Sequence, residues 1–403
     1  MVSESSDRLR QPAQVTSPST PDADVVILGG GLSGLWLAHQ LADHASVLLI
    51  EPAESLPSPS HTALGIVAAG QAESPARLEK ALGSEGAHRL WEWSQYACRS
   101  LRLLADELEV PREALPVYRL SLDRREEEEL RHSAELIAEW EGVDRVRTLE
   151  RRELTTVGFR DSFSFGVHLR SDFAFAPGSL VAALEASLQG RVRRGTGNYV
   201  ITGLRGGQLE LHQDGKRLKT EIAVVAGGAG SAAAHPWLRD AIIPVRIHRS
   251  SFPGETGPGA QTAIPLAGLC RDRFESWVQR NEGLQFAGCR WAEGPDLGAT
   301  RKPSAEVLSA VIEAQDSFIK LHLTGNPDWA AGLRDAAVTD FSCDGLPLVG
   351  PLPGSPRVLA MCGWNGWGFS AIGSAVAELT AAILGKPAPF SSTQGLLHPR
   401  RML

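Results

Sequence analysis

The chain has 403 residues and a formal net charge of −7; 43% of its residues are hydrophobic and 22% are charged. This composition is typical of a soluble globular protein, and the length favours two or three domains. The acidic balance argues against a nucleic-acid binder, which needs a basic surface, and no apolar run reaches the about 18–20 residues that span a bilayer.

The N-terminal segment, residues 1–21, is rich in Ser, Pro and Thr, so we expect it to be disordered. It holds no apolar core of the kind that a secretory signal needs. The five cysteines are odd in number and form no C-x-x-C pair, which favours reduced thiols over a disulfide or zinc scaffold. These features together indicate a cytoplasmic protein.

A strand–turn–helix–strand pattern comes next. Residues 24–28 are a short apolar run, and the glycines that follow match G-x-G-x-x-G. An apolar helix begins after the second glycine, and a second apolar strand ends at an acidic residue. The pattern predicts a dinucleotide-binding βαβ unit whose cofactor contacts come from Gly29, Gly31, Leu32, Ser33, Gly34 and Glu51.

Each part of this unit has a physical role. The first glycine permits a tight turn, the second lets the backbone approach a pyrophosphate, and the third lets helix and strand pack closely. The helix start offers free N–H groups and a partial positive charge to the phosphates. The Glu51 carboxylate can accept hydrogen bonds from ribose hydroxyls. The unit by itself does not separate FAD from NAD.

The middle of the chain predicts further helices over residues 86–109 and 123–141, and one that begins at Pro177. Residues 198–213 read as antiparallel strands, followed by a buried strand over 222–226 that ends at Gly227. Residues 241–333 show a mixed pattern, with Pro/Gly-rich loops.

The C-terminal part predicts a strand over 357–361, a glycine loop over 363–369, and a buried helix from about Ser370 to Leu384. A glycine loop that enters a helix brings unpaired N–H groups to the helix start. Such a start favours a nearby negative charge, including the anion of a reduced flavin.

These pieces together resemble the FAD-dependent amine and D-amino-acid oxidase superfamily, the group of glycine oxidase, sarcosine oxidase and γ-glutamylputrescine oxidase. The resemblance extends over about residues 24–386, and residues 82–94 look most like the γ-glutamylputrescine oxidase branch. The resemblance rests on these segments: Gly29–Gly34 with Glu51, Ala63–Val67, Ala223–Gly230, Asp344–Gly350 and Gly363–Phe369.

The resemblance implies an α/β fold of two domains. A Rossmann-like FAD-binding domain would be assembled from residues 22–95, 160–240 and 342–390. An interleaved substrate domain, with an antiparallel sheet, would take 96–159 and 241–341, and residues 391–403 would form a tail. It also implies oxidation of a CH–NH or CH–NH₂ bond of an amine or amino acid by hydride transfer to flavin N5, which gives an imine that hydrolyses. Oxygen or another acceptor would then reoxidise the flavin.

The resemblance further implies site residues beyond the βαβ unit. Arg334 falls where glycine oxidase-like members hold a substrate carboxylate, although here residues 336–343 separate it from the Asp-Gly-x-Pro segment. The remaining cofactor contacts would be Gly65, Ile66, Gly227, Gly363, Trp364, Asn365, Gly366, Trp367, Gly368 and Phe369.

Several alternatives stay open at this point. His61 is four residues before Gly65, one more than in relatives that attach flavin through histidine, so a loop histidine near the flavin is favoured over a covalent link. Cys343 and Cys362 match poorly the spacing of relatives whose flavin is linked to cysteine. Trp364 and Trp367 form either an aromatic wall for an amine or core packing. One of three further residues could lie over the flavin, with no basis for a choice: Arg246, His248 and Arg249.

Two other functions remain possible from the sequence. One is a different flavoenzyme, either an NAD(P)H-dependent monooxygenase or a biosynthetic desaturase, although no second G-x-G-x-x-G is present. The other is a flavin-holding protein without turnover. The histidines are scattered and show no metal-ligand spacing, so no metal site is expected.

Overall fold

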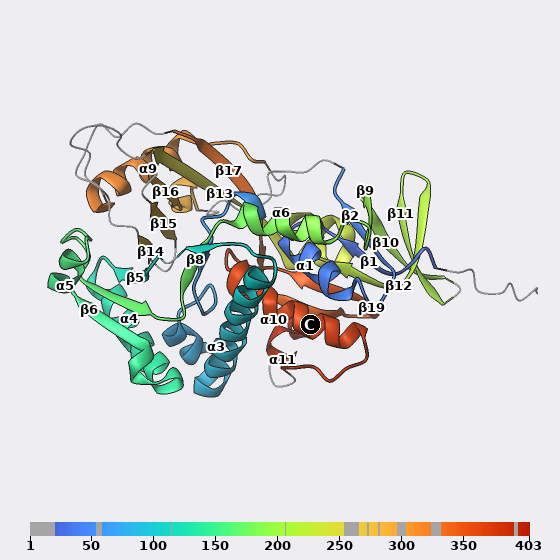
Figure 1. Ribbon diagram of the computed structural model, residues 1–403, viewed down its shortest axis with the longest axis horizontal. Helices are drawn as coiled ribbons and strands as arrows, with labels where there is room; N and C mark the ends of the chain where they lie inside the picture. Colours follow the sequence, from blue (N-terminus) through green and yellow to red (C-terminus); the bar gives the residue numbers. More distant parts are fainter. Residues whose placement is uncertain are drawn as a thin grey trace, which may run out of the picture.

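The computed structural model describes residues 21–53, 59–113, 115–205, 207–253, 266–271, 274–280, 283–295, 304–323, 332–390 and 394–403. Apart from Pro21, the N-terminal segment for which we expect disorder lies outside these ranges. Two large sheets lie side by side along the long axis of the molecule, with the long helix α3 (Pro75–Glu107) between them (Figure 1). None of the described helices is both long and apolar enough to cross a membrane.

The first sheet is built on five parallel strands. Their order across the sheet is β9 (Arg193–Thr196), β2 (Val47–Glu51), β1 (Ala23–Leu28), β12 (Lys216–Val225) and β19 (Ser355–Cys362). Three antiparallel strands extend it: β10 (Val200–Arg205) and β11 (Gln208–Gln213) beside β12, and β18 (Leu348–Leu352) beside β19.

Apolar side chains on both faces of these strands explain why the sheet is covered on both sides. In β1, Val25 and Ile27 belong to one buried cluster, whereas Val26 and Leu28 belong to another, as the two-residue repeat of a strand requires. The first cluster includes residues of α1 (Leu32–Leu41), α3, α6 (Pro177–Ser187) and α10 (Ile372–Ile383). The second includes residues of α7 (Ser231–Ala234) and α8 (Pro236–Ala241).

The second sheet is largely antiparallel; among the strand pairs that the described residues form in it, only β14 with β5 is parallel. Its strand order is β17 (Arg334–Ser342), β13 (Ile242–Pro253), β16 (Gly283–Ala287), β15 (Glu275–Arg280), β14 (Leu266–Cys270), β5 (Val117–Ser121), β7 (Phe165–Leu169) and β6 (Val146–Glu150). Helices near it are α4 (Arg124–Glu141), α5 (Arg151–Thr156) and α9 (Ser309–Phe318). A small sheet joins β3 (Ile66–Val67), β8 (Phe173–Phe175) and β4 (Arg112–Glu113).

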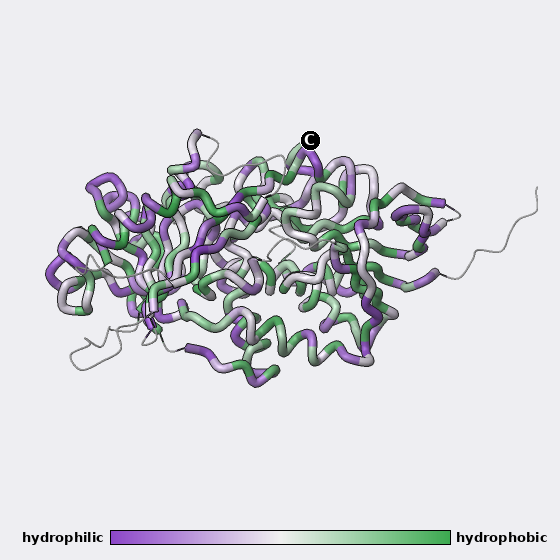
Figure 2. The backbone as a smooth tube through the Cα atoms, turned by 90° about the horizontal axis from the view of Figure 1, so that it is seen from above, coloured by the Kyte–Doolittle hydropathy of each residue, from purple (hydrophilic) through white to green (hydrophobic). Residues whose placement is uncertain are grey.

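The predicted elements with the clearest periodicity are confirmed, among them α4, α6, α10 and the β10–β11 hairpin. The helix expected over 86–109 is the second part of α3, which begins eleven residues earlier because Ser74 caps it and Pro75 suits its first turn. Gly83, with φ of +75°, breaks the regular helix between the two parts. Figure 2 shows hydrophobic segments running through the middle of the molecule and hydrophilic ones along much of its outer edge.

The expected domain ranges can be compared with the strand pairing. Strand β7 falls inside the range 160–240 that we expect for the FAD-binding domain, but it pairs with β5 and β6 in the second sheet. Helix α3 runs through residue 95, the expected boundary, without interruption. The pairing of β7 thus places residues 165–169 with the second sheet and not with the first.

Candidate functional site

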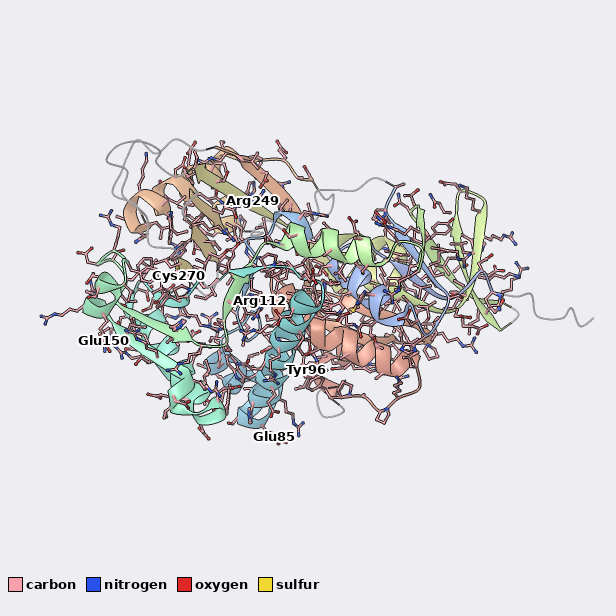
Figure 3. The ribbon with its side chains drawn as sticks, in the orientation of Figure 1. Glu85, Tyr96, Arg112, Glu150, Arg249 and Cys270 are labelled. Atoms are coloured by element: carbon pink, nitrogen blue, oxygen red, sulfur yellow. The ribbon has the colours of Figure 1, made fainter. Side chains whose placement is uncertain are left out.

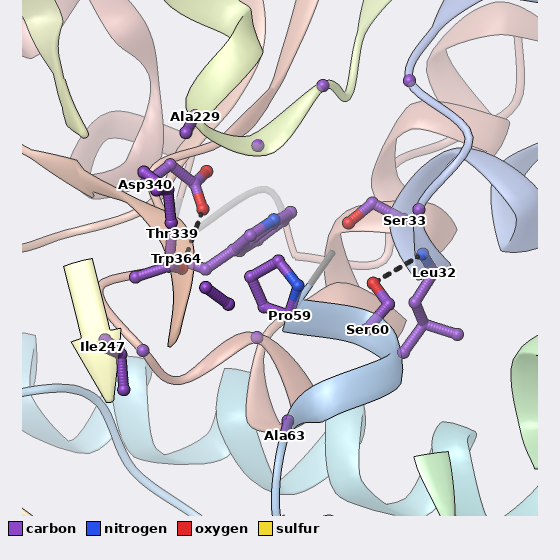
Figure 4. Close-up of a pocket in the computed structure, with 18 of the residues that line it drawn as sticks. Leu32, Ser33, Pro59, Ser60, Ala63, Ala229, Ile247, Thr339, Asp340 and Trp364 are labelled. Atoms are coloured by element: carbon purple, nitrogen blue, oxygen red, sulfur yellow. Dashed lines mark hydrogen bonds between the residues drawn. The ribbon is translucent and has the colours of Figure 1, made fainter. Parts of the chain in front are cut away.

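A cavity of about 1220 Å³ lies between the two large sheets. Its walls include the carboxyl ends of β1, β2 and β12, which is where parallel sheets commonly bind ligands. Figure 4 shows Leu32 and Ser33 at one end of the cavity and Thr339, Asp340 and Trp364 at the other. Of the predicted site residues, all line this cavity except Gly34, Gly363 and Arg334.

The glycine turn at the first end leaves no room for side chains. Gly29 has φ of +133°, and a Cβ added to it would lie 2.3 Å from the carbonyl oxygen of Ala226. A Cβ at Gly34 would lie 1.8 Å from the Gly29 carbonyl oxygen, so Gly34 serves the packing of α1 on the turn and does not line the cavity. This close packing is the role that the sequence pattern assigns to the third glycine.

The start of α1 has the properties of an anion site. Its N-cap Gly31 offers no side-chain hydrogen bond, and its first turn has no acidic residue. The Leu32 N–H donates to the hydroxyl of Ser60, at 3.1 Å, on the short helix α2 (Pro59–Thr62) beside it (Figure 4). The positive end of the helix dipole therefore meets no negative side chain of its own first turn and suits a pyrophosphate.

Glu51, at the end of β2, also lines the cavity. Its Oε1 accepts a hydrogen bond from Arg194 Nε at 2.9 Å, whereas its Oε2 has no hydrogen-bond partner among the described residues. Together with the glycine turn and the helix start, this oxygen provides the acceptor that a ribose hydroxyl needs. The residues present therefore fit the ADP part of a dinucleotide.

The glycine loop at the other end is tied to β17. The Gly363 N–H donates to Asp340 Oδ2 at 2.5 Å, and Gly363 has φ of +77°, a conformation that favours glycine. Asn365 donates from Nδ2 to the Gly363 carbonyl at 2.7 Å and accepts at Oδ1 from the Ser342 N–H at 2.9 Å. These bonds hold Trp364, which is 7% exposed, against the cavity.

Asp340 is a site residue that the sequence analysis missed. It lines the cavity although it is only 2% exposed, and none of the described residues forms a salt bridge with it. Burial raises the pKa of its carboxyl group. No motif marks this residue in the sequence, because its neighbours are brought to it by the pairing of β17 with distant segments.

The face of the second sheet that closes the cavity carries small side chains, among them Ser276, Ala287 and Ala337, beside larger ones such as Leu269 and Arg249. Ala287 on β16 stands beside Ser276 on β15, and Ala337 on β17 stands beside Ile247 on β13. Short side chains on adjacent strands leave space between the sheet and the opposite wall. This face therefore has room for a small substrate beside the cofactor.

Arg290, which the sequence analysis also missed, is the notable charge on this side. It lines the cavity, and its guanidinium lies 4.4 Å from the ring centre of Phe274 and 4.6 Å from that of Phe341. It forms no hydrogen bond or ion pair with the residues that the structure describes. Burial lowers the pKa of Arg290, but a guanidinium stays charged at any physiological pH. A half-buried, unpaired cation of this kind suits an anionic ligand group.

Arg334 does not reach the cavity. Its Nη2 donates to Asp316 Oδ1 at 2.5 Å, its Nη1 donates to the Ser250 hydroxyl, and its guanidinium lies over Phe252. Its donors therefore serve α9 and β13 on the other face of β17. The next residue, Asp335, does line the cavity and pairs with Arg249, which is labelled in Figure 3 on β13.

The remaining candidates divide clearly by position. His61 lines the cavity on α2 and is exposed, whereas Cys343 and Cys362 lie away from it. His248 is fully buried, with Nε2 accepting from the Leu308 N–H at 3.0 Å, and burial lowers its pKa to about 4. Arg246 pairs with Glu293 at 2.6 Å. Of Arg246, His248 and Arg249, only Arg249 lines the cavity.

Comparison with known structures identifies the same architecture. Glycine oxidase from Geobacillus kaustophilus superposes with a TM-score of 0.73 at 16% identity, over 95% of this chain and 100% of that one. L-amino acid deaminase from Proteus myxofaciens gives a TM-score of 0.73 at 15% identity, over 100% and 98%. L-proline dehydrogenase from P. horikoshii gives 0.72 at 14% identity, over 95% and 98%. These similarities confirm the predicted α/β two-domain fold.

Sequence comparison identifies the family. The probable oxidoreductase OrdL of Rhizobium meliloti (strain 1021) is 26% identical over 248 residues, which are 59% of this chain and 56% of that protein's length. The chain thus spans about half the length of the curated relative that it matches. The family model described as "FAD dependent oxidoreductase" matches residues 24–383, nearly all of the chain. The chain belongs to this DAO family of FAD-dependent oxidoreductases, and FAD is its cofactor.

Proposed function

We propose that this protein oxidises the CH–NH or CH–NH₂ bond of an amine or amino acid that carries an anionic group, most simply a carboxylate. The observation that carries the proposal is the guanidinium of Arg290, which forms no ion pair with any described residue and lines the same cavity as the glycine turn. Bound FAD supplies a hydride acceptor in chemistry of this kind. The protein's own residues bind and orient the substrate.

The cavity walls support a substrate of this chemistry. No described residue accepts a hydrogen bond from Arg290, whose guanidinium lies against the rings of Phe274 and Phe341. A guanidinium offers paired N–H groups to a carboxylate. Trp364 and Trp367, which both line the cavity, offer aromatic faces to the amine end. Amino-acid names among the structural neighbours agree with this proposal, although their identities of 14–16% carry the fold alone.

The test is anaerobic reduction of the purified flavoprotein, which is monitored through the visible absorbance of the flavin. Amino acids, N-methyl amino acids, D-amino acids and γ-glutamyl amines are added in turn, each with its decarboxylated counterpart, and NAD(P)H last. Bleaching by a carboxylate-bearing amine, and not by its counterpart, is the expected result. Bleaching by NAD(P)H alone would contradict this proposal and indicate a monooxygenase or a reductase. A flavin that no donor reduces would indicate a flavin-holding protein without turnover.

Arg290→Met then tests the residue. Losing a charged hydrogen-bond partner in a buried site costs about 2–5 kcal/mol, so KM for the carboxylate-bearing substrate should rise about 30-fold or more. Arg334→Met is the matched control, because that guanidinium is bonded to Asp316 and Ser250 outside the cavity. A KM that rises with Arg334→Met and not with Arg290→Met would indicate that Arg334, and not Arg290, binds the substrate carboxylate.

A further inference from the structure

Arg194 joins two carboxylates at the adenosine end of the cavity. It lies on β9, at the edge of the first sheet. Its Nε donates to Glu51 Oε1 at 2.9 Å, and its Nη2 donates both to the same oxygen and, at 3.2 Å, to Glu185 Oε1. Glu51 and Glu185 both line the cavity, whereas Arg194 does not, so Arg194 supports the site from behind.

The contribution of these ion pairs to folding is small. The side chains of Arg194, Glu51 and Glu185 are 36%, 35% and 38% exposed, and ion pairs this exposed to water stabilise a fold weakly. Their effect is geometric instead. Because two guanidinium donors end on Glu51 Oε1, the torsions of the glutamate are restrained while Oε2 keeps no partner among the described residues.

The glycine turn shows where the Glu51 side chain lies. A Cβ added at Gly30 would lie 2.4 Å from Glu51 Cγ and 3.4 Å from Glu51 Oε2. The carboxylate therefore crosses closely over the backbone of Gly30, between the two glycines that carry the dinucleotide motif. Gly30 occupies a variable position of that motif, and here it is glycine because Glu51 needs the space.

We propose that Arg194 is a positioning residue for the cofactor, which holds Glu51 so that Oε2 is set to accept a hydrogen bond from a ribose hydroxyl of the adenosine part of FAD. An unrestrained glutamate would lose its side-chain freedom on binding, and this loss corresponds to about a tenfold lower affinity. The guanidinium also offsets the repulsion between Glu51 and Glu185, which would otherwise turn the two carboxylates apart. The proposal concerns FAD binding and is independent of the substrate.

The test is a double-mutant cycle in which FAD binding to the full-length apoprotein is measured by the quenching of flavin fluorescence. Arg194→Met keeps the aliphatic stem and removes the donors, and it should raise the Kd for FAD about tenfold. In the Glu51→Gln background the same substitution should have no further effect. Arg193→Met, on the neighbouring residue whose guanidinium bonds to the Asp22 carbonyl, is the control and should bind FAD as the wild type does.

Three results would overturn the proposal: unchanged affinity in Arg194→Met, an equal loss in the Glu51→Gln background, or an equal loss in Arg193→Met. The midpoint of thermal unfolding of each apoprotein is measured beside the Kd, because a purely structural role would lower the midpoint without coupling to Glu51. If Arg194→Met does not fold, Arg194→Lys replaces it in the same cycle. Lysine keeps the charge but loses the fork, so its Kd should lie between those of the wild type and Glu51→Gln, and a wild-type value would count against the proposal.

Discussion

Glu378 is a carboxyl group whose ionisation should destabilise the folded protein at neutral pH. It lies on α10, is 6% exposed, and accepts a hydrogen bond at Oε1 from Trp93 Nε1 at 2.6 Å. No described residue forms a salt bridge with it. Burial, partly offset by the Trp93 hydrogen bond, raises its pKa to about 7 from an ordinary value of 4.5. Glu378→Gln removes the ionisation, and the amide oxygen can still accept from Trp93.

The magnitude and its sign follow from linkage. Because the folded pKa is higher than the unfolded one, the stability that the protonated group contributes is complete below about pH 4.5 and is lost as pH rises through about 7. A shift of about 2.5 pKa units corresponds to about 3 kcal/mol. The variant should therefore be about 3 kcal/mol more stable than the wild type at about pH 7.5 and within about 0.5 kcal/mol of it at about pH 4.5.

Urea denaturation of both apoproteins across this range measures the difference, and comparing variants at each pH cancels the other titrating groups. Glu313→Gln, at an exposed position of α9, is the matched control and should show no pH-dependent difference. A constant difference between Glu378→Gln and the wild type from about pH 4.5 to 7.5 would show that the carboxyl group does not titrate there, and would refute the reasoning.

Further predictions concern other buried groups. His248 has a folded pKa of about 4, below its ordinary value of 6.5. Because the unfolded state takes up a proton as the pH falls from about 8 to about 5, the free energy of unfolding of the wild type should decrease by about 2 kcal/mol over this range. In denaturant titrations, the free energy of unfolding of His248→Gln should decrease less. Gly29→Ala should lower the melting temperature and abolish flavin binding, because its Cβ would lie 2.3 Å from the Ala226 carbonyl oxygen; a yellow, stable variant would contradict this. Gly31→Val should fold but bind no flavin, since a branched side chain blocks the approach of the pyrophosphate, and full FAD occupancy would place the pyrophosphate elsewhere. Asp340→Asn should keep the Gly363 hydrogen bond and shift the flavin absorbance or its pH dependence, and identical spectra at every pH would limit Asp340 to holding the loop.

The cofactor half of the site could be predicted because its parts are neighbours in the chain. Strand β1, the glycine turn, α1 and β2 occupy residues 23–51, and each part has a local signature: an apolar run, glycines where a Cβ does not fit, and a carboxylate at the strand end. The glycine loop before α10 is equally local. The sequence alone therefore determined the family resemblance and the cofactor, and most of the residues that it predicts for FAD line the cavity.

The substrate half depends on strand register, which the sequence leaves open. In the first part of β17, Asp335 and Ala337 line the cavity, whereas Arg334 and Ala336 do not. Because side chains alternate between the faces of a strand, one residue of register decides whether an arginine meets the substrate or the helix behind the sheet. The position of Arg334 in the sequence could not reveal which face it takes.

The remaining residues acquire their roles from what surrounds them in space. Arg290 stands out because none of the described residues forms an ion pair with it, and Arg194 because it meets an acid 143 positions away. A charged residue in the sequence is as consistent with a surface ion pair as with a site, and only tertiary structure decides which charges are satisfied. The sequence thus determined the glycine turn and the acid that follows it, whereas the packing of the two sheets decided which charges line the cavity.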